Sequence, residues 1–392
     1  MTDPIRKAVF ITSVDYESPI QVGDHQLARQ FASNGWQVIF ISKPITPWHL
    51  VARDNNSFKR RFSTCLSNGR WYTHGKGIIC SFVPFAAVIP KNEIFLAKKW
   101  VFQYWHKTIF PNIKKNLAVK GFLDVDLLHI RDPLQGYLLD LINAKKKVFR
   151  VADNDSGFSS YNPFYTQAEH KIASKVDLVA YSAHQLENRV RQLQPKQAVF
   201  LPNGVDFEHF QKVKAIPELY RSCSRPLIVY AGSIDFWFDF DLINRLAIAL
   251  PKFTFVIIGP NQNFGSRFVK VKNLILTGPV PHSELPAFLC YADIGIIPFN
   301  RRDFPTLVNA ICPVKLYEYM ACGLPVVASK WDEIEQIASP ALLCSSYEEF
   351  LTALMNYQPL KERADTYIQF AKQNDWSKRF NALLKLISDV GP

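Results

Sequence analysis

Short apolar stretches alternate with helical patterns along most of this chain, and the alternation occurs in two consecutive series. The first series has expected strands at 7–13, 36–41, 78–83, 126–130, 147–152, 178–181 and 198–201, with helices at about 25–34, 134–143, 164–175 and 184–193. The second series has expected strands at 227–232, 253–258, 274–277, 294–299, 325–328 and 341–344. Strands that alternate with helices predict parallel sheets covered on both faces, so the expected fold class is α/β.

The length of the chain, 392 residues, fits two domains better than one. The turn cluster Pro202-Asn203-Gly204-Val205-Asp206 follows the first series, and a segment rich in Pro and Ser, about 212–226, precedes the second. We therefore expect an N-terminal Rossmann-like domain over 1–210, a C-terminal Rossmann-like domain over 211–373 and a final helix within 374–392. The first strand–loop–helix unit lacks a G-x-G-x-x-G turn, which argues against a dinucleotide cofactor.

The stretch from Pro313 to Val327 reads as a helix, a glycine stop and a buried strand. Pro313 suits the first turn of a helix, and Gly323 can take the left-handed conformation that ends one. Lys315 and Glu318 are three residues apart, so they share one face. A lysine beside a helix N-terminus can hold a phosphate, and a carboxylate one turn further can hold a ribose diol. A solvated ion pair between the two side chains is the alternative.

Residues 318–327, Glu-Tyr-Met-Ala-Cys-Gly-Leu-Pro-Val-Val, resemble the E-A-x-A-x-G-x-P-V-V segment of GT-B glycosyltransferases close to family 4. The resemblance implies two Rossmann-like domains with parallel sheets facing across a cleft, and a last helix that crosses back to the first domain. It implies that Glu318 binds the ribose of a nucleotide-sugar donor. The preceding P-x-K is similar to that of the bacterial polysaccharide branch (teichuronic acid and exopolysaccharide type), which implies that Lys315 binds the diphosphate. A second glutamate, common eight residues upstream, is replaced by Ala310.

Ligands of open parallel sheets bind beyond the carboxyl ends of the strands, so the loops there are candidates for the donor site. The resemblance makes the Gly232 loop a wall of the diphosphate site, although the arginine and lysine that often follow are replaced by Phe236-Trp237-Phe238-Asp239. The implied donor-binding residues, besides Lys315 and Glu318, are Gly23, Gly232, Ser233, Val280, Pro298, Val314 and Leu316. A plain turn glycine at 232 and ordinary strand-end turns at 280 and 298 are the alternatives.

Acidic residues and a histidine at strand ends of the first series are the candidates for acceptor activation. Asp24 or His25 could accept a proton from an acceptor hydroxyl, and Asp132 and Asp153 are further base or acceptor-side candidates. The alternative is that Asp24 caps the helix, that His25 lies on its surface and that the other acids cap helices or loops. Asp132, Asp153 and Asp155 together could also bind a metal. The resemblance implies a class without a D-x-D metal site, so we expect no metal and no other cofactor.

The segment from about 94 to 115 combines aromatic and basic residues, and Pro111 is expected to kink or split its helix. The chain carries a formal net charge of +12, and twelve Lys or Arg but a single acid lie between Asn55 and Lys120. Three interpretations fit this segment: a core helix, a nucleic-acid surface and a membrane surface. No nucleic-acid module accompanies it, whereas Trp, Tyr and Phe suit a membrane interface and lysines suit anionic lipid heads.

The resemblance implies an enzyme that moves a sugar from a nucleotide-diphosphate donor to a saccharide or lipid-linked saccharide in cell-surface polysaccharide synthesis, and it favours a UDP-sugar as the donor. Lys315 would also act in catalysis, by neutralising the leaving diphosphate. No run of about 18 apolar residues and no signal peptide are present, so we expect a cytoplasmic protein at the inner face of the membrane. A sugar-nucleotide 2-epimerase of the same fold and a membrane-bound scaffold without catalysis are the alternatives.

Overall fold

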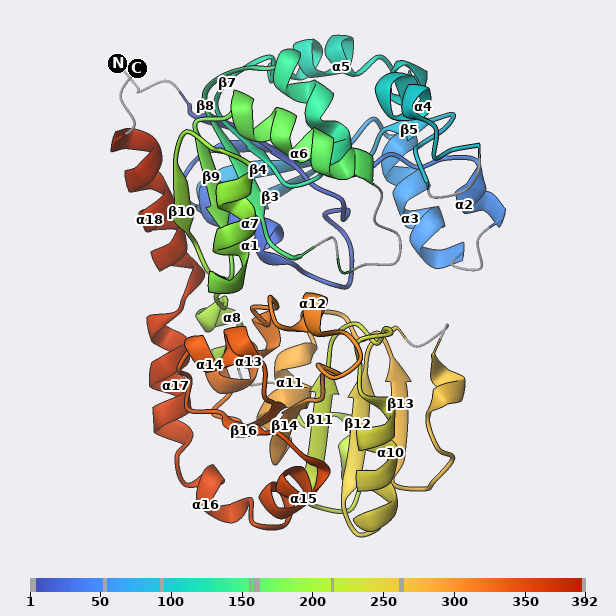
Figure 1. The fold of residues 1–392 in the computed structure, drawn as a ribbon, viewed down its shortest axis with the longest axis vertical. Helices are drawn as coiled ribbons and strands as arrows, with labels where there is room; N and C mark the ends of the chain where they lie inside the picture. Colours follow the sequence, from blue (N-terminus) through green and yellow to red (C-terminus); the bar gives the residue numbers. More distant parts are fainter. Residues whose placement is uncertain are drawn as a thin grey trace. The chain divides into compact units, whose positions relative to one another are not determined.

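The computed structural model describes residues 5–51, 55–91, 95–154, 157, 163–212, 215–260 and 264–389 (Figure 1). The chain divides into two compact units. The first unit contains Met1–Ser18, Gly23–Leu201 and Phe380–Pro392, and the second contains Pro19–Val22 and Pro202–Arg379. The short segment 19–22 and the last residues of the chain therefore group differently from their sequence neighbours.

The first unit is built on an eight-stranded sheet with the order β10-β9-β8-β7-β1-β2-β4-β3. Neighbouring strands are parallel except for β3, which pairs antiparallel with β4. Strand β1, in the middle, has the sequence Lys-Ala-Val-Phe-Ile, and its four apolar residues are buried because both faces of the sheet are covered. The strands are β1 (Lys7–Ile11), β2 (Gln37–Ile41), β3 (Arg70–His74), β4 (Gly77–Phe82), β7 (Asp124–Ile130), β8 (Asn143–Val151), β9 (Leu178–Tyr181) and β10 (Ala198–Phe200).

The helices of the first unit follow the strands as the sequence predicts, with shorter and more broken elements between 43 and 120. They are α1 (Gly23–Ser33), α2 (Trp48–Val51), α3 (Asn55–Leu66), α4 (Lys99–Tyr104), η1 (Trp105–Thr108), α5 (Ile113–Lys120), η2 (Pro133–Asp140), α6 (Pro163–Lys175), η4 (His184–Leu186) and α7 (Glu187–Gln192). Two short strands, β5 (Phe85–Ala86) and β6 (Ile109–Phe110), form a separate antiparallel pair. The edge strand β3 and this pair were not predicted.

The second unit contains a six-stranded parallel sheet with the order β13-β12-β11-β14-β15-β16. Helices α10 and α15 contact each other, and α13 contacts both α8 and α17. The strands are β11 (Leu227–Ala231), β12 (Thr254–Ile258), β13 (Leu274–Gly278), β14 (Ile294–Ile297), β15 (Val326–Ser329) and β16 (Leu342–Cys344). The helices are α8 (Phe207–Gln211), α9 (Glu218–Arg221), α10 (Phe240–Ala249), η5 (Gly265–Arg267), α11 (Leu285–Cys290), α12 (Pro305–Val308), α13 (Val314–Ala321), α14 (Asp332–Gln336), α15 (Tyr347–Met355), α16 (Gln358–Lys361) and α17 (Ala364–Gln373).

The last helix, α18 (Trp376–Asp389), starts in the second unit and ends in the first. Within the first unit, its Phe380 ring packs edge-on against Phe31 of α1, with 4.8 Å between ring centroids. Trp376 and Phe380 are both buried, so α18 contributes side chains to the hydrophobic core. The sequence predicted a closing helix at this position.

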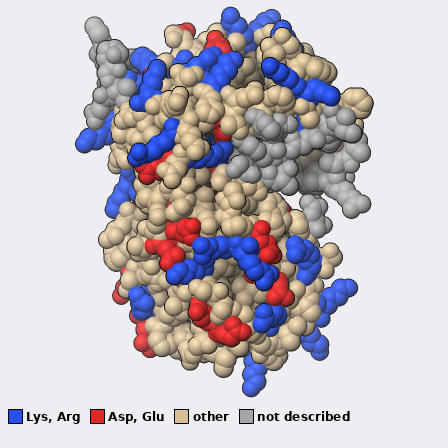
Figure 2. Space-filling model, in the orientation of Figure 1, with Lys and Arg blue, Asp and Glu red and all other residues tan. Residues whose placement is uncertain are grey.

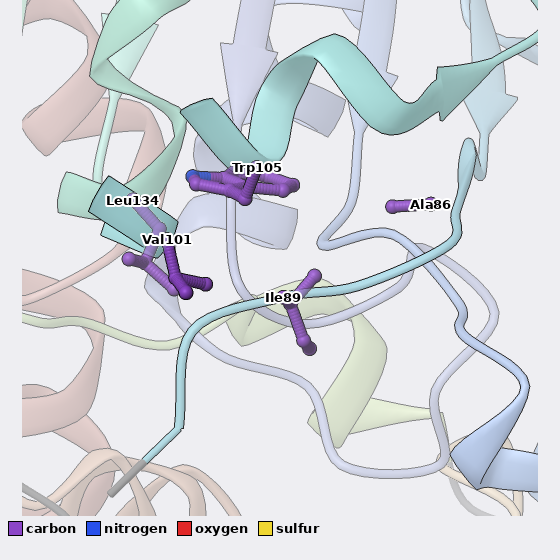
Figure 3. Packing of buried hydrophobic residues seen from close by; sticks show 5 residues of the cluster. All are labelled: Ala86, Ile89, Val101, Trp105 and Leu134. Carbon is purple, nitrogen blue, oxygen red and sulfur yellow. The ribbon is translucent and has the colours of Figure 1, made fainter. Parts of the chain in front are cut away.

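The aromatic segment 94–115 is not one helix. Helix α4 is followed by η1, by the short strand β6 and, after Pro111, by α5. Val101 of α4 and Trp105 of η1 are buried in a cluster with Ala86, Ile89 and Leu134, which we call the Trp105 cluster (Figure 3). Phe102, Ile109 and Tyr137 pack against it. The helical segment is therefore split near Pro111, as expected, with η1 and β6 between α4 and α5, and Ile94 lies outside the described residues.

Candidate active site

The carboxyl end of β11 is followed by a glycine that has no room for a side chain. Gly232 has φ of 151°, a conformation that favours glycine. A Cβ at this position would lie 2.8 Å from Cε and 3.2 Å from Nζ of Lys315, and 3.3 Å from Oη of Tyr230. The side chain of Lys315 thus occupies the space that any side chain at position 232 would need. The glycine is therefore required by packing against Lys315 as well as by the turn.

Lys315 lies in the first turn of α13, and aromatic rings enclose its ammonium group. Its Nζ lies 4.7 Å from the ring centroid of Phe299 and 5.2 Å from that of Tyr230, within the range of cation–π attraction. Burial lowers the pKa of Lys315 to about 8, although the nearby carboxylate of Glu318 opposes the shift. A lysine that has lost water in this way gains more from an anionic ligand than an exposed lysine does.

Glu318 lies one turn further along α13, with only 8% of its surface exposed. Burial raises the pKa of Glu318 to about 7, against the lowering effect of Lys315. The solvated ion pair considered as an alternative is wrong, because Glu318 is buried. A buried carboxylate of this kind is suited to accept hydrogen bonds from a diol, which would favour its charged form.

A pocket of about 90 Å³ opens in the second unit between the ends of β11, β12 and β13 and the face of α13 that carries Glu318. Its lining comprises Ala231, Gly232, Ile258, Gly259, Pro260, Pro279, Val280, His282, Leu285 and Glu318, together with Pro19, Ile20 and Gln21 of the segment that groups with this unit. Sites for whole ligands typically enclose about 300–1,000 Å³. The pocket therefore has the size for one part of a nucleotide, such as its ribose.

A larger pocket of about 500 Å³ lies elsewhere in the second unit, beside Arg245, Arg301, Arg302 and Lys330. Each of these cations already has a carboxylate partner: Asp241 at 3.6 Å, Asp332 at 2.8 Å, Asp303 at 3.1 Å and Glu335 at 2.9 Å, respectively. Figure 2 shows basic and acidic side chains mixed on the visible face of this unit. Size alone favours this pocket, but the smaller one is lined by Glu318 and by Gly232, beside which Lys315 lies, and we place the candidate donor site there.

The other predicted donor residues of the second unit have different surroundings. Val280 lines the smaller pocket. The carbonyl of Ser233 accepts a hydrogen bond from the Tyr230 hydroxyl at 2.5 Å, and the carbonyl of Pro298 accepts one from the Asp239 amide at 2.8 Å. Val314 is half-buried at the start of α13, and Leu316 is fully buried, so the Leu316 side chain packs in the core.

Two residues that position the loops at the carboxyl ends of β11 and β12 were not predicted from the sequence. The Tyr319 hydroxyl accepts a hydrogen bond from the Ala231 amide at 2.6 Å, which fixes α13 against the end of β11. A Cβ at Gly259 would lie 1.9 Å from the carbonyl oxygen of Gly232, so the two glycine loops pack backbone to backbone. Gly259 follows β12 as Gly232 follows β11, and this shared position was the signal that could have identified it.

In the first unit, Asp24 lies inside the first turn of α1 and is buried beside two arginines and a histidine. Its carboxylate oxygens lie 3.5 Å from Nη1 of Arg131, 3.8 Å from Nε2 of His129 and 3.9 Å from Nε of Arg150. Burial by itself would raise the pKa of Asp24, but these neighbours outweigh it and hold the pKa below its ordinary value. A buried carboxylate with a lowered pKa is a weak base, and Asp24 is a helix residue rather than the N-cap considered above.

His25 is fully buried, so the surface position considered for it is wrong. Its Nε2 lies 3.0 Å from the carbonyl oxygen of Asp15, which acts as the hydrogen-bond acceptor. Burial lowers the pKa of His25 to about 4, and the imidazole is therefore neutral near pH 7. Gly23, the residue before Asp24, is also buried in the first turn of α1.

The remaining acids of the first unit make structural contacts. Asp132 caps η2 by accepting a hydrogen bond from the Leu134 amide at 3.1 Å, as the alternative interpretation expected. Asp153 forms an ion pair with Arg131 at 2.6 Å, and Asp155 lies outside the described residues. Within the described ranges, no group of three or more His, Cys, Asp and Glu side chains could hold a metal ion.

Two parts of the chain match glycosyltransferase families. Residues 10–182 match the N-terminal domain of the glucuronosyltransferase GumK, and residues 225–357 match the glycosyl transferases group 1. The chain belongs to the GT-B glycosyltransferases. The two matches fall on the two series of strands and helices, and the second contains the whole of α13 and the Gly232 loop.

One curated relative is a Bacillus subtilis protein assigned to teichuronic acid biosynthesis as the glycosyltransferase TuaH. It is 29% identical over 182 residues, which cover 44% of this chain and 45% of the relative. The aligned stretch thus spans about half the length of that relative.

Solved structures share the fold over nearly the whole chain. Sucrose-phosphate synthase from Thermosynechococcus elongatus superposes with a TM-score of 0.70 at 16% identity and covers 98% of this chain and 99% of its own. HepE from Anabaena, solved with UDP and glucose, has a TM-score of 0.64 at 13% identity and covers 98% of this chain and 100% of its own. This GT-B glycosyltransferase therefore keeps the two-domain fold that its sequence predicts.

Proposed function

We propose that this GT-B glycosyltransferase transfers a sugar from a UDP-sugar to a saccharide or lipid-linked saccharide in cell-surface polysaccharide synthesis. The observation that carries the proposal is the position of Lys315, whose side chain fills the space beside Gly232 at the carboxyl end of β11. A UDP-sugar is supported by the structure of HepE, which contains UDP. A role in polysaccharide synthesis is supported by the likeness to TuaH and to the N-terminal domain of GumK.

In the proposed reaction, Lys315 stabilises the charge that develops on the leaving diphosphate. The ammonium group is already desolvated by Phe299 and Tyr230, so little solvent reorganisation is needed when that charge appears. The N-terminus of α13, where Lys315 lies, carries a partial positive charge that adds to this stabilisation. Glu318, in the pocket one turn away, holds the ribose hydroxyls and fixes the donor for transfer.

The test of the proposed reaction is UDP release from a panel of UDP-sugars, measured with and without a lipid extract that contains polysaccharide intermediates. We expect release that depends on the extract, and loss of at least about 100-fold in Lys315→Ala, the size typical for removing one group that stabilises transition-state charge. Release of a free epimerised sugar without any extract would establish the 2-epimerase instead. Failure of every UDP-, GDP- and ADP-sugar to bind would favour a scaffold.

We also propose that the first unit docks on an anionic membrane surface through the outward residues of segment 94–115. Trp100 is 63% exposed and Phe110 is 71% exposed, and Lys99, Lys107, Lys114 and Lys115 are exposed beside them. Figure 2 shows Lys and Arg side chains along the top of this unit. Aromatic rings suit the interface, and each nearby cation contributes about 1 kcal/mol. No helix within the described residues is long and apolar enough to cross a membrane.

Sedimentation with lipid vesicles tests this docking. We expect binding to vesicles that contain phosphatidylglycerol and weak binding to vesicles of phosphatidylcholine alone. Trp100→Ala should weaken binding to the anionic vesicles, while Trp71→Ala, which removes a 49%-exposed Trp from β3, serves as the matched control. Equal binding of both variants and the wild type would contradict the proposed surface.

A further inference from the structure

Two cysteines of the second unit lie together at the ends of two helices. Cys290 is the last residue of α11, and Cys322 is the C-cap of α13. Both thiols donate to the carbonyl oxygen of Phe210, at 3.8 Å and 3.7 Å respectively. Helix α8, which carries Phe210, contacts both α11 and α13 (Figure 1). A single backbone carbonyl therefore receives both sulfur atoms.

The two thiols also contact each other, and the contact makes them unequal. Both cysteines are free and half-buried. The hydrogen bond from the Cys322 thiol lowers the pKa of Cys290, against the raising effect of burial. The same contact, together with burial, holds the pKa of Cys322 well above its ordinary value. Since the thiolate is the reactive form of cysteine, Cys290 is the better nucleophile and Cys322 is a neighbouring thiol that can resolve its oxidised form.

Both helices also contribute to the candidate donor pocket. Leu285, the first residue of α11, and Glu318 of α13 belong to its lining. Cys322 lies one turn beyond Glu318, and its amide donates to the Glu318 carbonyl at 3.4 Å. A movement of Cys322 would therefore pass along the last turn of α13 to the carboxylate that is proposed to hold the ribose.

We propose that Cys290 and Cys322 form a redox modification site, at which a peroxide produces a disulfide that weakens donor binding. The Cys290 thiolate attacks one oxygen of hydrogen peroxide, the O–O bond breaks, and a sulfenic acid forms while the hydroxide that leaves takes up the proton lost by Cys290. The Cys322 sulfur then attacks the Cys290 sulfur, the S–O bond breaks, and the Cys322 proton leaves with the oxygen as water. Two thiols are thereby oxidised to one disulfide, and one peroxide is reduced to two waters.

The disulfide changes the distance between the two helix ends. Its sulfur atoms lie about 2.05 Å apart, which is closer than two thiols joined only by a hydrogen bond. Cys322 must therefore move toward α11, and the last turn of α13 moves with it. The effect on UDP rests on the proposed function, whereas formation of the disulfide does not. A disulfide that forms in a reducing compartment is usually transient and redox-sensing, which fits a reversible modification.

The test treats the full chain with hydrogen peroxide, blocks the remaining thiols with iodoacetamide and maps unreduced peptides by mass spectrometry. We expect a cross-linked pair of peptides that joins residues 290 and 322, and its loss after treatment with dithiothreitol. Calorimetry on the same samples should find that oxidation weakens UDP binding about fivefold or more, the lower end of typical coupling between two sites. Dithiothreitol should restore the affinity.

Cys223→Ser is the matched control, because Cys223 is also half-buried and its thiol also donates to a backbone carbonyl, that of Leu219 at 3.1 Å. This variant should respond to peroxide as the wild type does. Cys290→Ser and Cys322→Ser, with folds checked by thermal melts, should bind UDP equally well before and after peroxide.

Absence of the cross-link between 290 and 322 in peroxide-treated wild type would overturn the modification site. An unchanged UDP affinity in the cross-linked wild type, or an equal loss of affinity in the Cys290→Ser and Cys322→Ser variants, would overturn its effect on the donor pocket. Failure of the reduced wild type to bind UDP would instead count against the proposed function, while the peptide map still decides whether the disulfide forms.

Discussion

At the scale of single residues, the candidate donor site depends on close packing between Lys315 and Gly232, which are far apart in the sequence. Lys315 could be identified from its place after Pro313, but its close approach to Gly232 could not, because no local pattern records which side chain fills the space above a distant loop. The same holds for the aromatic lining from Tyr230 and Phe299. Both residues lie in expected strands, 227–232 and 294–299, and the structure adds that both rings face the Lys315 ammonium group.

Gly232→Ala should weaken UDP binding by more than tenfold. The added Cβ would meet Cε of Lys315 at 2.8 Å and push the ammonium group from its place, and φ of 151° adds backbone strain of about 1–3 kcal/mol. Gly323→Ala is the control, because Gly323 has φ of 70° but its Cβ would meet only Ile368 and Ala364, at 3.4 Å or more. Calorimetry should find weakened binding in the first variant alone, and equal affinities would refute the packing argument.

UDP binding near pH 8 should be coupled to proton uptake. Burial holds the pKa of Lys315 at about 8, so about half of the free protein lacks this proton at pH 8, and a bound diphosphate restores the pKa toward higher values. Calorimetry in buffers of different ionisation enthalpy should therefore find an uptake of about 0.5 proton per UDP at pH 8. The affinity should fall as the pH rises above 8. Lys315→Arg, which stays protonated, should bind UDP without uptake; the same uptake in this variant would contradict the assignment.

At the scale of elements, the strands and most helices could be predicted from alternation, whereas segment 94–115 could not. Its aromatic and basic residues have a helix-like spacing. Val101 and Trp105, however, pack against Leu134, more than 25 positions away, and α4 ends at Tyr104. The pattern cannot separate a tryptophan that packs in a core from one that faces solvent. Figure 3 shows Trp105 pointing into the cluster with Val101 and Leu134.

Trp105→Ala and Trp100→Ala should therefore differ in stability although they are five residues apart. Trp105 is 2% exposed and Trp100 is 63% exposed. Loss of a buried tryptophan typically costs about 3–5 kcal/mol in the free energy of unfolding, whereas an exposed one changes it by about 0.5 kcal/mol or less. Urea unfolding should find a large loss in the first variant alone. Equal losses would mean that Trp100 also packs in a core.

At the scale of the whole molecule, two units built on parallel sheets could be predicted because a strand buried on both faces leaves a continuous apolar run. The GT-B fold followed from the resemblance of one motif, Glu318–Val327, which lies within the second series. The surroundings of the candidate acceptor-side residues could not be predicted from the sequence in the same way. Asp24, His25 and Asp132 were sensible candidates by position, but Asp24 depends on side chains from β7 and β8, His25 on the Asp15 carbonyl and Asp132 on the Leu134 amide.

The measurement that tests the account most directly is the shift in melting temperature caused by UDP in the wild type, in Lys315→Ala and in Lys330→Ala. Lys330 belongs to the larger pocket and is paired with Glu335, so it separates the two candidate sites. A ligand at 100 times its Kd stabilises the folded state by about 2.7 kcal/mol. We predict that UDP raises the melting temperature of the wild type and of Lys330→Ala but not of Lys315→Ala. An undiminished shift in Lys315→Ala, or a shift lost in Lys330→Ala alone, would contradict the donor site described here.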